Sequence, residues 1–114
     1  MKLITKEINA QLLANHAIEA ADGGTGSIKP PLKLFLPWGA ATWLISERDP
    51  ENPDILFGLC DLGFGSPELG SVSLSELQSV KRFGLGIERD RYFKPTMTLA
   101  EYADKAREAG RIAA

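Results

Sequence analysis

Apolar residues recur at helical spacing in the first part of the chain. This spacing predicts a helix over residues 6–21 that turns one stripe of side chains toward the core. Thr5 is suited to cap the first turn, and Gly23 is suited to end the helix. His16 lies beside the stripe, at a boundary position. The stripe consists of Ile4, Ile8, Leu12, Leu13, Ala17 and Ile18.

From residue 32 the pattern changes to alternation, which predicts strands. Prolines on both sides of the first strand favour an edge position, and its turn into the second predicts a hairpin with Trp43 in the core. The third strand is apolar on both faces, as a central strand is. Its Gly58 and Cys60 are small enough to let a neighbouring backbone approach, and Cys60 is expected to be an inert buried thiol. The four predicted strands are residues 32–36, 41–46, 54–62 and 68–73.

The remainder of the chain carries two helix starts. Ser73 with Glu76, and Thr98 with Glu101, match the capping box, in which a hydroxyl and a carboxylate satisfy backbone N–H groups reciprocally. Between the two helices, residues 85–94 are predicted to contain a last strand. The inward positions of the first, short helix are Leu74, Leu77 and Val80.

Strands that follow one another through short turns predict an α+β fold. We expect a single domain of residues 1–114, with a mainly antiparallel sheet of four to five strands and about three helices packed against it. Hydrophobic residues make up 44% of the chain, which is enough for a core.

Composition excludes several classes of protein. Cys60 is the only cysteine and His16 the only histidine, so an internal disulfide is excluded and an intrachain zinc site would need carboxylate ligands. The first residues lack the apolar run of a signal peptide, and no stretch reaches the length of a membrane span. We therefore expect a cytoplasmic protein without a cofactor.

Charge is unevenly distributed, although the net charge is only -2. Residues 47–68 hold six acidic residues against Arg48 alone, a local balance of -5. Residues 81–94 hold five basic residues against two acidic ones, a balance of +3. Both segments are also compatible with ordinary solvated loops.

The acidic segment suggests a protein-binding surface. An exposed tryptophan at the turn after the first strand would suit the centre of such an interface. The candidate residues are Trp38, Glu47, Asp49, Glu51 and Asp54. The alternative is nucleic-acid binding through the basic segment, where an aromatic ring could stack on bases. Its candidates are Lys81, Arg82, Arg89, Arg91, Tyr92 and Lys94.

Catalysis has little support in the sequence. Nucleophilic catalysis needs a base beside the nucleophile, and the single histidine lies on a helix edge. A metal-dependent nuclease or hydrolase could use Asp61 and Glu68, which lie on the two sides of one turn and could share a cation. Asp54 is too far along the strand from Asp61 to join them, since seven residues span roughly 23 Å.

Several motifs together resemble the DUF2958 family, whose function is unknown. They are the opening MKLITKEI, the GAATWL run at residues 39–44, FGLCDLGFGSPELGSVSLSEL at residues 57–77 and IERDRYFKP at residues 87–95. The resemblance covers nearly the whole chain and implies a small bacterial protein often carried with plasmid and other mobile-element genes. It implies no catalytic residue.

These observations favour a non-catalytic interaction or regulatory protein. A mobile-element origin would make inhibition of a host protein through an acidic surface a natural special case. Nucleic-acid binding through residues 81–94, and metal-dependent chemistry at Asp61 and Glu68, are the alternatives.

Overall fold

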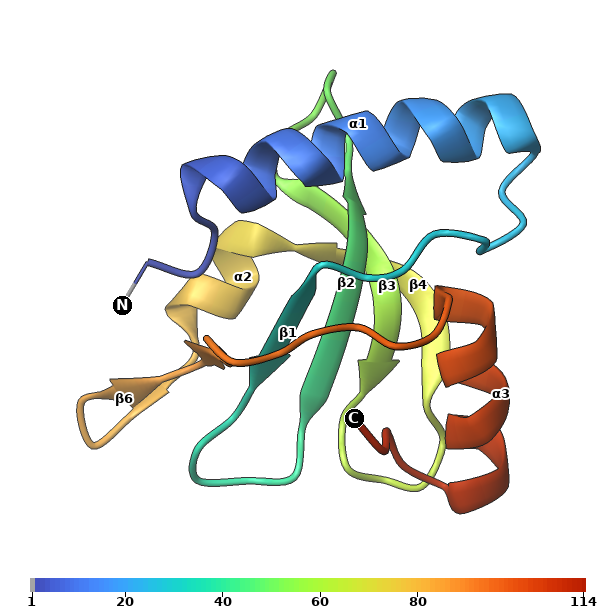
Figure 1. The fold of residues 1–114 in the computed structure, drawn as a ribbon. Coiled ribbons are helices and arrows are strands. Elements are labelled where there is room, and N and C mark those ends of the chain that lie inside the picture. Colours follow the sequence, from blue (N-terminus) through green and yellow to red (C-terminus); the bar gives the residue numbers. More distant parts are fainter. Residues whose placement is uncertain (1) are drawn as a thin grey trace.

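The chain runs through a helix, four strands, a short helix, three very short strands and a last helix (Figure 1). The computed structural model describes residues 2–114. The helices of this part are α1 (Lys6–Asp22), α2 (Leu74–Ser79) and α3 (Leu99–Ala109). The strands are β1 (Leu32–Phe35), β2 (Thr42–Arg48), β3 (Ile55–Asp61), β4 (Glu68–Ser73), β5 (Lys81–Arg82), β6 (Leu85–Gly86) and β7 (Glu88–Arg89).

Within the described chain, five strands form an antiparallel sheet in the order β4-β3-β2-β1-β7, and β5 and β6 form a separate hairpin. The helices pack around the sheet, so the α+β prediction is confirmed (Figure 1). The prediction that β1 is an edge strand is wrong. The chain returns after the hairpin, and β7 pairs with β1 through Leu34 opposite Arg89 and Phe35 opposite Glu88.

The two faces of the sheet carry separate hydrophobic clusters. One face, with Trp43 and Ile45 of β2, packs against the start of α1 and against α2. The other face, with Leu44 and Leu59, packs against α3. Because successive side chains of β2 point to opposite faces, this strand contributes to both hydrophobic clusters. The middle strands are therefore apolar on both faces.

The predicted caps are present. The Thr5 hydroxyl accepts a hydrogen bond from Ile8 N, and α1 ends at Gly23 in the left-handed region, with φ 77°. Thr98 and Glu101 form the full capping box of α3. At α2 the Ser73 hydroxyl accepts from Glu76 N, which is one half of the predicted box; the reciprocal bond from Ser73 N to the Glu76 carboxylate is not seen among the described residues.

The apolar stripe of α1 is predicted correctly only in its first half. Ile4 and Leu12 are buried, but Ile18 is 50% exposed and Ala17 is exposed as well. The buried positions further along are Asn15 and Glu19. Val80, expected to point inward from α2, is 36% exposed because the helix has already ended at that residue. None of the helices in residues 2–114 is long and apolar enough to cross a membrane.

Candidate functional site: an acidic pocket beneath α1

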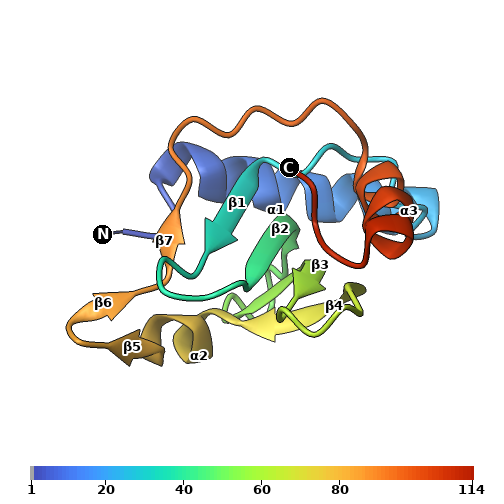
Figure 2. The ribbon, with the colours of Figure 1, turned by 90° about the horizontal axis from the view of Figure 1, so that it is seen from below.

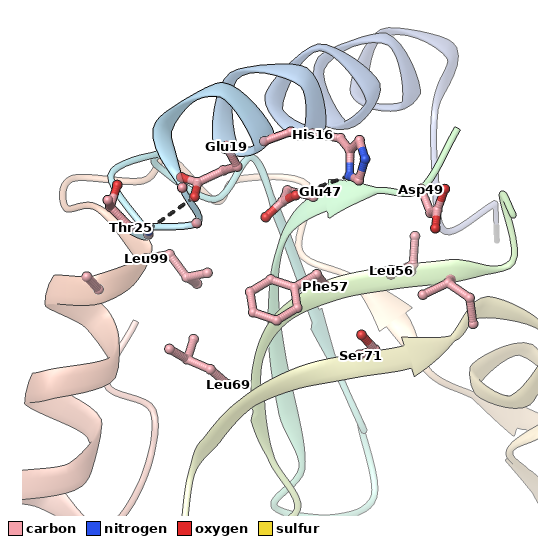
Figure 3. A pocket seen from close by; sticks show the side chains of 16 residues that line it. His16, Glu19, Thr25, Glu47, Asp49, Leu56, Phe57, Leu69, Ser71 and Leu99 are labelled. Atoms are coloured by element: carbon pink, nitrogen blue, oxygen red, sulfur yellow. Dashed lines mark hydrogen bonds and ion pairs between the residues drawn. The ribbon is translucent and has the colours of Figure 1, made fainter. Parts of the chain in front are cut away.

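A pocket of about 410 Å³ lies between the second half of α1, the α3 face of the sheet and the first turn of α3 (Figure 3). Glu19, Glu47 and Asp49 contribute carboxylates to its lining, and His16 lies beside Glu47. No lysine or arginine is found among the described residues that line it. The pocket is therefore acidic on its α1 side.

Glu19 is a buried charged residue with an unpaired atom. Its residue is only 4% exposed, because the α1–β1 loop covers it. One carboxylate oxygen, Oε2, accepts a hydrogen bond of 3.1 Å from Gly26 N. The other, Oε1, is buried and has no hydrogen-bond partner among the described residues. Leaving a buried acceptor unpaired costs free energy, so native proteins rarely do so without a reason.

A β-bulge brings Glu47 to the same pocket. Ile45 pairs with Gly58, and the next paired residue of β2 is Glu47, opposite Phe57, so Ser46 is the extra residue. Without the bulge Glu47 would point to the opposite face, because successive strand residues alternate. The carbonyl of Ser46 accepts a hydrogen bond of 3.0 Å from the side chain of Asn15. The buried Asn15 of α1 thus stabilises the irregularity that places Glu47.

The environment of Glu47 disfavours its charged form. Burial and then repulsion from Glu19 raise the pKa of its carboxyl above the usual value, while His16 opposes the shift. His16 Nδ1 lies 3.3 Å from one carboxylate oxygen of Glu47. In Figure 3 the other oxygen of Glu47 points away from His16, toward the side of the pocket where Glu19 lies.

The lower wall of the pocket is apolar. Phe57 of β3, Leu69 of β4 and Leu99 of α3 lie beneath the two carboxylates (Figure 3). Leu69 is 38% exposed, whereas Leu99 is almost completely buried. The site therefore presents negative charge above and hydrocarbon below, which suits a cation carried on an apolar stem.

Asp49 and Asp54, the two aspartates of residues 47–54, have local partners. Asp49 Oδ1 accepts hydrogen bonds from Glu51 N (2.8 Å) and Asn52 N (3.2 Å), which shapes the β2–β3 loop. Asp54 accepts from the hydroxyls of Ser73 and Ser75 and from Ser75 N, and so holds the start of α2. Glu51 is exposed.

Trp38 does not belong to this acidic surface. It lies in the β1–β2 turn, and β2 separates that turn from the β2–β3 loop at the other end of the sheet (Figure 1). Its indole Nε1 donates a hydrogen bond of 3.2 Å to Leu85 O, and the Arg82 guanidinium lies 5.8 Å from the centre of its ring. The ring is 37% exposed, and it joins the β5–β6 hairpin to the sheet.

The basic segment is spread over three places. Lys81 and Arg82 lie in the β5–β6 hairpin, Arg89 lies in β7, and the others lie in the long connection to α3 (Figure 2). Arg89 Nη1 donates a hydrogen bond to Lys2 O. The members in the connection are Arg91, Tyr92 and Lys94, all exposed.

Asp61 and Glu68 are not brought together. Cys60, not Asp61, is paired with Glu68, so Asp61 and Glu68 point to opposite faces of the sheet. Asp61 is buried, and its two oxygens accept hydrogen bonds of 2.9 Å from Gly63 N and Ile112 N. In residues 2–114 no group of three potential metal ligands gathers. The structure therefore does not bring these two carboxylates together at the turn.

Sequence reasoning missed Glu19. It lies seven residues after Leu12 and four after Asn15, so all three fall on one face of α1. The signal in the sequence was that polar residues, Asn15 and Glu19, continue the apolar stripe of α1. Cys60 is half-buried rather than buried, and its burial raises the pKa of its thiol to about 11, the direction expected of an inert thiol.

The sequence also places this α+β domain in a protein family. The family described as protein of unknown function (DUF2958) matches residues 3–113. The chain belongs to this family. Comparison with curated proteins and with solved structures gave no match.

Proposed function

We propose that this protein is a non-catalytic interaction protein that binds a protein partner through the acidic face around the pocket. The observation that carries the proposal is the convergence of Glu19, Glu47 and Asp49 on one pocket, which no lysine or arginine of residues 2–114 lines. Glu51 extends the same negative charge onto the surface of the adjoining loop. Clustered charge of one sign attracts and orients a partner of the opposite sign.

Several further features of the proposal rest on the family resemblance and on composition. A protein encoded on a bacterial mobile element, acting in the cytoplasm, would meet host proteins, and inhibition of one of them is the regulatory role that we propose. Trp38 is not part of the proposed contact, because it lies at the other end of the sheet. Asp54 is left out as well, since its carboxylate holds α2.

Affinity capture from a host that carries the element tests this proposal. The tagged protein and its Glu51→Lys variant are compared, with Glu108→Lys as a control that makes the same charge change on exposed α3. We expect a stoichiometric protein that survives nuclease treatment, is captured by wild type and control, and is lost with Glu51→Lys. Capture that disappears after nuclease treatment would instead favour nucleic-acid binding through residues 81–94.

A further inference from the structure

The pocket beneath α1 has the features of a receptor for one side chain. Resting on the proposed function, we infer that it binds an arginine side chain of the partner, with the guanidinium group between Glu19 and Glu47 and the aliphatic stem against the apolar wall. The inference names the chemistry that the acidic face recognises.

Two carboxylate oxygens beside the pocket can still accept hydrogen bonds, although Glu19 Oε1 is closed to solvent and its side chain must turn to meet a ligand. Glu19 Oε1 is buried without a partner among the described residues, and only one oxygen of Glu47 is engaged by His16. A guanidinium carries five N–H donors in a rigid plane and can bridge two carboxylates, whereas neutral polar groups would leave the charges uncompensated. A cation between the two carboxylates would also relieve their repulsion, which contributes to the raised pKa of Glu47.

The apolar wall selects a cation on a stem over a bare ion. Phe57 and Leu69 lie under the carboxylates (Figure 3), and Leu69 is 38% exposed. A guanidinium stacks on aromatic faces, and its weak hydration makes transfer into a half-buried site less costly than for an ammonium. At about 410 Å³ the pocket lies toward the small end of the roughly 300–1,000 Å³ typical of ligand sites. A side chain suits that size.

The arrangement is built rather than accidental. The bulge at Ser46 turns Glu47 to this face, and Asn15 supports the bulge. On the other side, Gly26 donates its N–H to Glu19 and packs closely against α3, since a Cβ at Gly26 would lie 3.2 Å from the Ala100 Cβ. Two elements distant in sequence thus fix the two carboxylates independently.

Titration of the full-length protein with N-acetyl-arginine methylamide, followed by amide NMR shifts, tests the inference. We expect saturable shifts at residues around Glu19, Gly26 and Glu47. The neutral isostere N-acetyl-citrulline methylamide should give none, and the lysine analogue should bind more weakly. Glu47→Gln should weaken arginine binding about tenfold, whereas Glu108→Gln, on exposed α3, should leave it unchanged.

Glu19→Gln should weaken arginine binding to a similar extent. If this substitution of a buried residue prevents folding, the Glu47→Gln variant tests the inference alone. Equal binding of arginine and citrulline, or shifts confined to other surfaces, would overturn the inference. If the probe does not bind while Glu51→Lys still loses the protein partner, the guanidinium inference fails and the proposed function stands. If the probe binds in the pocket but the partner is captured regardless of Glu51→Lys and Glu47→Gln, the pocket serves a free guanidinium compound and the proposed function fails.

Discussion

Asp54 shows how one carboxylate can join two elements. Its oxygens accept hydrogen bonds from the Ser73 hydroxyl (2.6 Å), the Ser75 hydroxyl (2.9 Å) and Ser75 N (2.8 Å), so the loop before β3 is fastened to the first turn of α2. The Ser73 hydroxyl, the Ser75 amide and the Ser75 hydroxyl lower the pKa of Asp54 from its usual value of 3.8. A negative charge at the amino terminus of a helix is also favourable because the helix dipole places partial positive charge there.

Replacing Asp54 should therefore destabilise the protein in a pH-dependent way. Because the folded-state pKa is depressed, the stabilisation is present above the unfolded value of 3.8 and is lost as the pH falls through the lower folded value. Thermal unfolding of Asp54→Ala should show a lower midpoint than wild type at pH 7 and a gap that narrows as the pH falls below 3.8. Glu51→Ala, in the same loop, is the control and should match wild type at every pH. A constant gap would contradict the assigned cause.

Residue patterns predicted the caps at Thr5, Ser73 and Thr98, because a cap and its helix are neighbours in sequence. They did not predict the partners of Asp54, which are supplied by residues about twenty positions away. Glu19 was missed for a related reason. Its burial depends on the loop that folds back over α1, and a charged residue in a helix is normally solvated.

The β2–β3 pair is the element on which the site depends. Gly58 of β3 faces Ile45 of β2, and a Cβ built on Gly58 would lie 2.0 Å from the Leu44 carbonyl oxygen. The close approach was predicted from the small residues of β3. The bulge beside it was not, because alternation read along a single strand carries no information on its register with a neighbour.

Gly58→Ala should be strongly destabilising, since the obstacle is backbone and cannot move without parting β2 from β3. We expect a loss of about 3 kcal/mol or more in the free energy of unfolding, measured in urea. Gly70→Ala is a matched control, because Gly70 is paired with Gly58 in β4 and a Cβ there meets nothing within 4 Å. That variant should lie within about 0.5 kcal/mol of wild type. Equal effects of the two substitutions would show that strand propensity, not close packing, is responsible.

At the scale of the whole molecule, the strand order was only partly predictable. Four strands, a last strand within residues 85–94 and three helices were anticipated. That the last strand, β7, follows a hairpin and pairs with β1 was not, because such a long return depends on tertiary contacts. The packing of the residues after α3 also depends on tertiary contacts. After α3 it returns to the sheet, where Ile112 is buried beside Leu44 and Leu59. Asp61 adds a hydrogen bond to this contact between the sheet and the end of the chain, since it accepts from Ile112 N.

Asp61→Asn should loosen this junction without affecting any metal response. Both oxygens of Asp61 accept backbone N–H groups, from Gly63 and Ile112, and an amide can accept only one of them. A buried donor left unpaired costs about 1–3 kcal/mol, which urea unfolding would detect. Faster carboxypeptidase trimming of the last residues would show that the chain end has been released.

Glu68→Gln is the control for this substitution, since Glu68 is exposed on the opposite face and should change stability by less than about 0.5 kcal/mol. Both variants are also measured with added Mg²⁺ and Mn²⁺, where we expect no change in the unfolding midpoint. Metal-dependent stabilisation of wild type that both substitutions abolish would restore the cation site at this turn. Loss of stability confined to Asp61→Asn, with or without metal, would establish Asp61 as the polar link between the sheet and the end of the chain.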